Sequence, residues 1–298
     1  MIRFPITARE LQQRITNHDS NWYQRVIDRQ RLLPANPTSK QFVSLWTDIK
    51  PVFVKLQNSK CIYCETLLEG AISNDIEHFR PKAKVSEWKV PRWLAKAGVQ
   101  VTPPTSPRGD PGYRDLAYCP WNYGASCKFC NTVLKKNYFP INGVRQPAGQ
   151  DPAAMNQEQA LLVYPIGNID DDPEHLLGFK GMHPEPLAAV GTFAHQRTLV
   201  VIELFRLNDA VRRKELFRAR AELIGHLYSQ LRHEASATTA ADLQDAREWI
   251  AVLTEPTSPH ASCLRCFEQT FRRDPGEAAQ LVADAKTFLK TGSLATGN

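Results

Sequence analysis

The sequence predicts an α+β protein that is mainly helical, with a cysteine-rich central unit between two helical regions. Two observations support this prediction. Apolar residues recur at helical spacing near both ends of the 298-residue chain, whereas the middle consists of short segments rich in cysteine, proline, aromatic and basic residues. The composition changes abruptly near residues 58 and 143. We therefore expect three parts: an N-terminal helical region (1–57), a central core (58–142) and a C-terminal, mainly helical region (143–298).

The N-terminal region contains two helical patterns separated by a break. Residues 21–33 and 39–56 place apolar side chains at helical spacing, and the sequence Pro-Ala-Asn-Pro-Thr at 34–38 interrupts them. Within the central unit, the proline- and glycine-rich stretch 101–112 predicts a loop. After the central unit, residues 143–157 have the composition of a linker.

Further helices are expected in the C-terminal region. A strand or a turn of helix leads to a long amphipathic helix that starts near Asn208, and helical patterns follow at 242–253 and 275–289. The acidic run from Asp170 to Asp172 has the composition of a helix N-terminal cap.

The chain shows no sign of a membrane segment. No apolar run approaches the roughly 18 residues that span a bilayer, and the N-terminus turns polar after a few residues, unlike a secretion signal. We therefore expect a cytoplasmic protein. Residues 78–140 hold eleven lysines and arginines against three acidic residues. A local basic excess suits a polyanion such as nucleic acid, and a lysine-rich soluble surface is an equally common explanation.

Six of the seven cysteines form three Cys-x-x-Cys pairs. An odd cysteine count without a secretion signal argues against a disulfide framework. The first two pairs are Cys61/Cys64 and Cys127/Cys130. Together they offer four thiolates to one tetrahedral zinc that would tie the two ends of the central unit together, the alternative being four buried reduced cysteines. Cys263 and Cys266 lack a second pair, and we expect ordinary core cysteines on a helix.

Candidate chemical groups lie between and beside these two cysteine pairs. The sequence Asp-Ile-Glu-His ends in Glu77 and His78, Asn122 lies five residues before the second pair, and Asn131 follows it directly. The segment from Cys127 predicts the start of a helix, with Asn131 facing the strand that carries Glu77 and His78. Taken alone, an acidic residue beside a histidine is usually a surface pair, and a lone asparagine usually caps a turn.

In combination, these residues resemble the zinc-containing HNH endonucleases. The order is a leading Cys-x-x-Cys, an acid–histidine pair, an asparagine, and a second Cys-x-x-Cys followed by histidine or asparagine. The resemblance implies a ββα-metal fold with the acid–histidine pair on the first strand, the asparagine in the loop and the last residue on the helix. His78, Asn122 and Asn131 would form an H-N-N version, in which asparagine replaces the usual final histidine.

The resemblance implies hydrolysis of nucleic-acid phosphodiester bonds. His78 would be the general base, since histidine titrates near neutral pH. Glu77 and Asn131 would hold a catalytic Mg²⁺ or Mn²⁺, with Asp75 as a further candidate ligand, because oxygen ligands suit hard cations. Asn122 would fix the hairpin and the imidazole. The candidate phosphate contacts are Arg80, Lys82, Lys135 and Lys136.

The flanking sequence is also similar to bacterial HNH proteins of antiphage defence, including the nuclease subunits of Septu and retron-associated systems. This looser similarity runs through most of residues 55–220 and implies a defence role with an ATPase partner. Three function classes stay open: a DNA-cutting nuclease, which we favour, an RNA-cutting nuclease, and a zinc-containing binding module without catalysis. Retention of Glu77, His78 and Asn131 argues against the third class, because a scaffold needs none of them.

Overall fold

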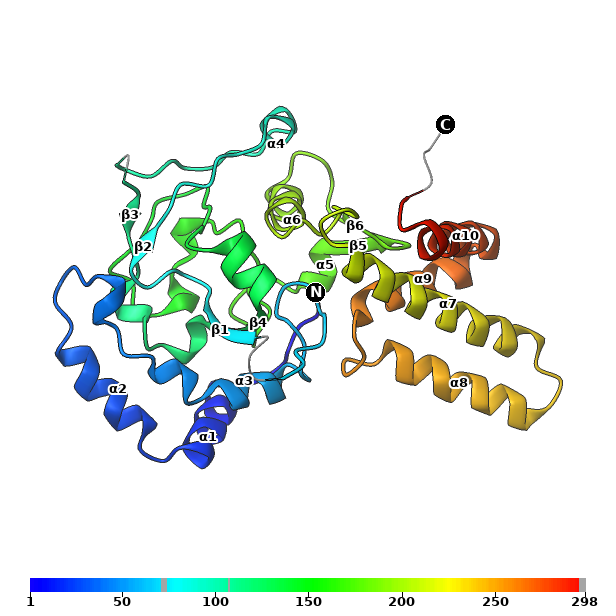
Figure 1. Cartoon of the computed structure of the whole chain (residues 1–298), viewed down its shortest axis with the longest axis horizontal. Coiled ribbons are helices and arrows are strands. Elements are labelled where there is room, and N and C mark those ends of the chain that lie inside the picture. The colour runs from blue at the N-terminus through cyan, green and yellow to red at the C-terminus, as the bar shows by residue number, and fades with distance from the viewer. Residues whose placement is uncertain (71–73, 107, 295–298) are drawn as a thin grey trace.

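Helices make up most of the regular structure in the computed structural model, which describes residues 1–70, 74–106 and 108–294. Three two-stranded antiparallel sheets complete the fold within this part of the chain. The predicted α+β, mainly helical class is therefore confirmed. Figure 1 shows the strands β1 to β4 near the N-terminal helices, and the last four helices gathered at the other end of the molecule.

The N-terminal region forms short helices around one buried tryptophan. Thr7 caps the first helix and makes a capping box with Glu10. Trp22, which is fully buried, donates from its indole nitrogen to the carbonyl oxygen of Leu45 at 2.8 Å. The helices are α1 (Ala8–His18), α2 (Trp22–Arg31) and α3 (Lys50–Leu56), with 3₁₀ turns at Ser39–Gln41 and Leu45–Thr47. The predicted break at 34–38 separates α2 from the first 3₁₀ turn.

The central unit contains two antiparallel strands followed by a helical segment. Strand β1 (Asn74–His78) pairs with β4 (Tyr123–Cys127), and a π-helix (Phe129–Lys135) begins directly after β4. The helix predicted to start at Cys127 therefore forms two residues later and with wider turns. Between the paired strands lie β2 (Lys84–Val85), α4 (Arg92–Lys96), β3 (Asp110–Pro111) and 3₁₀ turns at Arg114–Leu116 and Pro120–Asn122.

The stretch predicted as the loop 101–112 contains one element of regular structure among its described residues. Its end forms β3, which pairs with β2 in the register Val85 opposite Asp110. The carboxylate of Asp110 accepts from the backbone and hydroxyl of Thr105 and pairs with Arg145 at 2.7 Å. Pro107 lies outside the described residues.

The segment predicted as a linker is packed against the rest of the molecule. Met155 is buried in the main core, and the backbone nitrogens of Gly143 and Val144 donate to the carbonyl oxygens of Glu158 and Gln157. Two 3₁₀ turns lie here, Pro152–Ala154 and Asn156–Glu158. Sequence composition alone misses this packing because prolines and polar residues fill the segment.

The C-terminal region has a small hairpin and a stack of long helices. Asp172 caps α5, accepting from the backbone nitrogen of Glu174, so the predicted acidic cap is present. The long helix expected near Asn208 begins only at Lys214, because the chain turns after the preceding helix and Arg206 takes a positive φ of 50°. The elements are α5 (Pro173–Leu176), β5 (Leu177–Lys180), β6 (His183–Pro186), α6 (Phe193–Leu204), α7 (Lys214–Ser236), α8 (Ala240–Thr254), α9 (Ala261–Arg273) and α10 (Pro275–Thr291).

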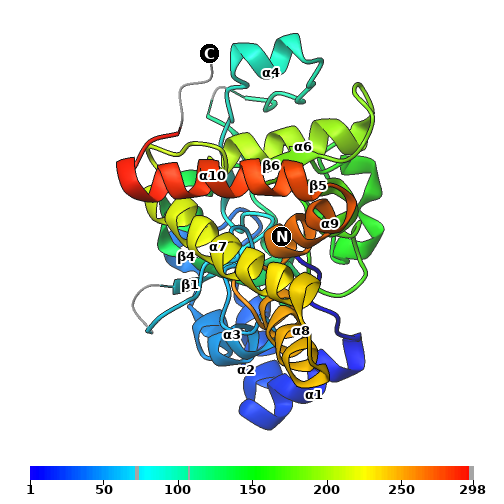
Figure 2. The same ribbon diagram turned by 90° about the vertical axis from the view of Figure 1, so that its right-hand side faces the viewer.

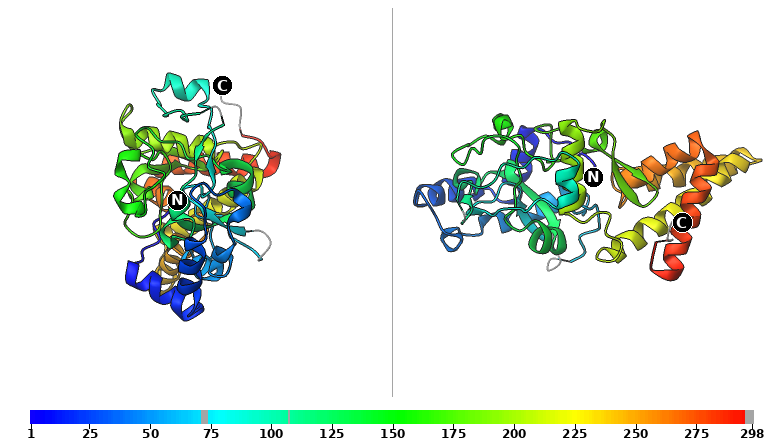
Figure 3. Two further views of the ribbon diagram at one scale, coloured as in Figure 1. Left: turned by 90° about the vertical axis from the view of Figure 1, so that its left-hand side faces the viewer. Right: turned by 90° about the horizontal axis from the view of Figure 1, so that it is seen from above.

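One hydrophobic core connects all three regions. Its buried residues run from Met1 to Phe288, and the ring of Tyr63 stacks on Phe205 with centroids 3.9 Å apart. In Figure 2, α7, α9 and α10 lie against one another, and Figure 3 shows the same helices at one end of the elongated molecule. Among the described residues, no helix has the length and apolar character that crossing a membrane requires.

Candidate metal centre and active site

The four cysteines of the first two pairs come together at one point. Their Sγ atoms all lie within 4.8 Å of one another, and the Sγ atoms of Cys64 and Cys127 are 3.9 Å apart. Tetrahedral zinc with Zn–S bonds of about 2.3 Å needs sulfur atoms about 3.8 Å apart. The residues therefore fit a structural zinc. The three elements that supply them are the turn after α3, the end of β4 and the start of the π-helix.

Local hydrogen bonds shape the two cysteine turns. The backbone nitrogen of Cys61 donates to Thr66 O at 2.9 Å. The backbone nitrogen of Cys130 donates to the sulfur of Cys127 at 3.4 Å. Ile62 N donates to Ala125 O at 3.0 Å, which ties the first turn to β4. The sulfurs therefore face one another because the backbone holds both turns against the same strand.

A cation from the C-terminal region also reaches the cysteine cluster. The guanidinium of Arg213, which is buried, donates to the sulfur of Cys130 at 3.4 Å and lies 4.9 Å from the ring of Phe129. Four thiolates on one zinc carry a net negative charge, which a buried arginine offsets. Cysteine spacing gave no signal for this contact, since Arg213 lies 83 residues from Cys130.

His78 lies at the end of β1 in an aromatic setting. Its Nε2 lies 3.0 Å from the carbonyl oxygen of Ala117, so this nitrogen must carry the proton and Nδ1 is the basic one. The rings of Trp46 and Tyr123 contact the imidazole edge-on at 4.6 and 5.1 Å. Burial, followed by the positive charge of Lys82, holds the pKa of His78 well below its usual value. The imidazole is therefore neutral at neutral pH.

Asn122 joins the ends of the two strands. Its Oδ1 accepts from the backbone nitrogen of Arg80 at 2.7 Å, and its Nδ2 donates to the carbonyl oxygens of Arg80 and Leu116 at 2.9 and 3.2 Å. The backbone bond from Phe79 N to Asn122 O adds to this clamp at 2.8 Å. Because Asn122 is fully buried, these bonds fix the backbone immediately after His78.

Glu77 points away from His78, since neighbouring residues on a strand face opposite sides. Its carboxylate pairs with the ammonium of Lys135, which also donates to the carbonyl oxygen of His78 at 2.9 Å. Both side chains are almost fully buried. Burial raises the pKa of Glu77 and lowers that of Lys135. The ammonium thus occupies the place where the predicted divalent cation would meet Glu77, so Glu77 as it stands does not fit that cation.

The other predicted cation ligands are more open. Asp75, two residues before Glu77 on β1, and Asn131 on the π-helix are both half-buried. Among the described residues, the four cysteines are the one group of three or more histidine, cysteine or acidic side chains arranged to hold a metal.

The predicted phosphate contacts have different surroundings. Arg80 is buried and pairs with Glu158 at 2.7 Å, and Lys135 is buried against Glu77, whereas Lys136 is exposed. Lys82 is half-buried, with its Nζ 4.4 Å from the centre of the Trp46 ring. It lines an open pocket of about 550 Å³. The indole of Trp46 therefore contacts both His78 and Lys82. The helical pattern around Trp46 in the sequence did not indicate this role.

The third cysteine pair lies elsewhere. Cys263 and Cys266 are on α9, where Cys263 is fully buried and donates to the carbonyl oxygen of Gly181 at 3.3 Å. This agrees with the expected core cysteines.

Taken together, the geometry defines a protein with a four-cysteine cluster that fits a structural zinc, beside a strand pair that carries a neutral, buried histidine. Over 132 residues, or 44% of this chain, the sequence is 35% identical to the Septu protein PtuB of Bacillus mycoides (strain KBAB4). The match covers 38% of that protein, so the chain spans well under half the length of the curated relative it matches. No protein-family model matches the chain. No solved structure matches it either.

Proposed function

We propose that this chain is an HNH-type endonuclease that hydrolyses phosphodiester bonds in nucleic acid, with DNA favoured over RNA, and that it acts in antiphage defence together with an ATPase partner. The observation that carries the proposal is the setting of His78. Its Nε2 is engaged by Ala117 O, which leaves Nδ1 as a neutral base beside the cation of Lys82. The defence role and the ATPase partner rest on the similarity to the Septu protein and to the wider sequence resemblance.

In the proposed reaction, Nδ1 of His78 accepts a proton from a water molecule as its oxygen attacks phosphorus. The bond from phosphorus to the leaving 3′ oxygen then breaks, and the 3′ oxyanion takes a proton from solvent water to become a hydroxyl. Lys82 and Lys136 offset the phosphate charge. The four cysteines would hold zinc, which supplies structure only. A catalytic Mg²⁺ or Mn²⁺ on Asp75, Glu77 and Asn131 remains a prediction, and the ion pair between Lys135 and Glu77 argues against Glu77 as its ligand.

An RNA-cleaving enzyme with the same centre is the second candidate. The third is a binding module without catalysis, which the buried base beside a cation argues against.

The proposal predicts that His78→Ala abolishes cleavage while zinc content, folding and nucleic-acid binding stay close to wild type. Loss of a positioned general base costs about 10²–10⁴ in rate. The assay follows plasmid, phage DNA and tRNA with Mg²⁺, with Mn²⁺ and with EDTA, in the presence and absence of the co-encoded ATPase.

The matched control is His175→Ala, a histidine in the short helix α5, which should cleave at the wild-type rate. If His78→Ala cleaves as fast as wild type, the active site is misassigned. Cleavage of tRNA alone would favour the RNA-cutting class.

A further inference from the structure

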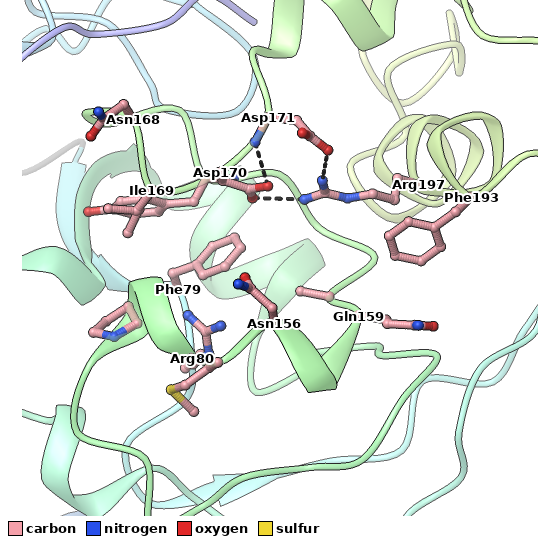
Figure 4. Close-up of a pocket in the computed structure, with 14 residues that line it drawn as sticks. Phe79, Arg80, Asn156, Gln159, Asn168, Ile169, Asp170, Asp171, Phe193 and Arg197 are labelled. Atoms are coloured by element: carbon pink, nitrogen blue, oxygen red, sulfur yellow. Dashed lines mark hydrogen bonds and ion pairs between the residues drawn. The ribbon is translucent and has the colours of Figure 1, made fainter.

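A second pocket lies beside Phe79 and Arg80, the residues that follow β1. It has a volume of about 480 Å³ and is bordered by the segment after β1, the turns at 152–160, the acidic run and α6. Figure 4 shows Phe79, Arg80 and Asn156 around its centre, with Arg197 on the opposite side. Pockets of roughly 300–1,000 Å³ suit small molecules or single groups of larger ones.

Arg80 is a buried hydrogen-bond donor that lines this pocket. Its side chain is only 7% exposed, and its Nε donates to Glu158 at 2.7 Å. Neither terminal nitrogen has a hydrogen-bond partner among the described residues, and Figure 4 shows the guanidinium turned toward Phe79 and Asn156. The centre of the Phe139 ring lies 5.3 Å from the guanidinium carbon of Arg80, a cation–π contact that helps to hold the guanidinium in place. Two parallel donors are therefore fixed in place with no acceptor.

The charges around the pocket do not favour an anion. Arg197 pairs with both Asp170 and Asp171 at 2.7 Å, and Arg80 pairs with Glu158. Each guanidinium is thus already neutralised, and the carboxylates outnumber the arginines. A phosphate would meet uncompensated negative charge here. A neutral, planar ligand with two adjacent acceptors is the better match.

We propose that this pocket binds a guanine base of the nucleic acid, an inference that rests on the proposed function. Guanine presents O6 and N7 side by side, and a guanidinium bonds both, whereas adenine presents a donor beside N7. The edge of the buried Phe79 ring borders the site apolarly, and Asn156 offers an amide for a further base edge. Arg80 is then a base-reading residue rather than the phosphate contact that the sequence suggested.

The pocket reads a nucleotide outside the scissile phosphodiester. His78 is the last residue of β1, and the pocket is lined by the two residues that follow it, Phe79 and Arg80, but not by His78 itself. The base must also leave its stack to enter, which costs least in single-stranded or locally opened nucleic acid.

Nucleosides test the pocket without any need for cleavage. The probes are guanosine, 7-deazaguanosine, which lacks N7, adenosine and cytidine, each titrated calorimetrically into the full zinc-loaded chain. Guanosine should bind about 5- to 150-fold more tightly than 7-deazaguanosine or adenosine. This factor is the discrimination expected from one bidentate hydrogen-bonded pair between an arginine and a base. Equal affinities, or tighter binding of cytidine, would overturn the guanine assignment.

Oligonucleotides then test the pocket in its proposed context. Labelled oligothymidines that contain one guanine or one adenine are bound to the His78→Ala chain. Adding Arg80→Lys keeps a cation beside Glu158 but removes the rigid fork, so it should lower the guanine preference. The backbone atoms of Arg80 that bond Asn122 are unchanged. Lys136→Ala, an exposed site, should weaken both oligonucleotides by the same factor.

The outcomes separate this inference from the proposed function. Oligonucleotide binding without base preference overturns the pocket and leaves the nuclease proposal standing. Guanosine binding without oligonucleotide binding supports the pocket and counts against the nuclease. Absence of both overturns both. A guanine preference that Arg80→Lys leaves unchanged also contradicts the inference, since the preference would then arise elsewhere.

Discussion

The buried ion pair between Glu77 and Lys135 fixes the charge balance beside His78. Removing two charges from water is costly, and their attraction repays that cost only when both are present. Here the ammonium also bonds the carbonyl oxygen of His78, so the pair stabilises the end of β1 as well as the carboxylate. Lys135 therefore acts as a positioning residue for the strand that carries His78.

Lys135→Met should destabilise the protein by about 3–5 kcal/mol, because it leaves Glu77 buried without a partner. The double variant Glu77→Gln/Lys135→Met should recover most of this loss, since neither charge remains. Urea unfolding in excess zinc measures both. A single variant that unfolds at the wild-type urea concentration would mean that the pair contributes nothing.

Residue types predicted some contacts at this site and not others. An acid–histidine pair and an asparagine between two cysteine pairs have few common structural uses together, so their proximity could be anticipated. A lysine in a basic segment looks like a surface residue in any sequence. Only the fold shows that Lys135 and Arg80 are buried against Glu77 and Glu158.

The strand pair of the site is too small to be stable alone. Strands β1 and β4 contribute five residues each, and an isolated two-stranded sheet is marginal in water. The four sulfurs lie where the turn after α3, β4 and the π-helix meet. Zinc at this point would join these three elements.

Cys127→Ser should therefore remove the zinc and unfold the centre, because structural zinc supplies much of the folding free energy of small units. Cys266→Ser is the matched control, since that cysteine also belongs to a Cys-x-x-Cys pair but lies on α9. It should keep one zinc per chain. Elemental analysis and circular dichroism make the comparison. Zinc-free protein that stays folded would refute the structural role.

Some long helices were predictable from the sequence and others were not. Helices α8 and α10 were both predicted, whereas the 12-residue α6 was expected as a strand or a turn of helix. Strands β2 and β3 have two residues each, too few for any periodicity. The β5–β6 hairpin was also missed, because its second strand contains two prolines.

At the scale of the whole molecule, the C-terminal helices are part of the support of the site. Arg213 reaches the sulfur of Cys130, and the rings of Tyr63 and Phe205 stack. Lys60 donates to the carbonyl oxygens of Pro256 and Ser258 at 2.5 and 2.8 Å. The composition changes near 58 and 143 predicted a separate central unit, but the sequence could not show how closely these distant segments pack.

His260 is buried at the start of α9, and it makes the stability of the folded chain depend on pH. Burial, followed by the positive charge of Arg220, lowers its pKa from 6.5 to about 4. In the unfolded chain the imidazole takes up a proton below about pH 6.5, whereas in the folded chain it stays neutral down to about pH 4. The unfolded state thus binds more protons in this window, so stability falls as the pH falls.

The contribution of His260 should approach about 1.4 kcal/mol per pH unit inside the window. His260→Asn removes this titration, and asparagine tolerates the left-handed backbone at this position, where φ is 55°. Urea unfolding at pH 7, 6 and 5 in excess zinc should therefore show a shallower loss of stability with acid for the variant than for wild type. Zinc release and the protonation of His78 affect both proteins equally, so the difference in slope reports His260 alone. Identical slopes would show that His260 is protonated at the same pH in the folded and unfolded chains.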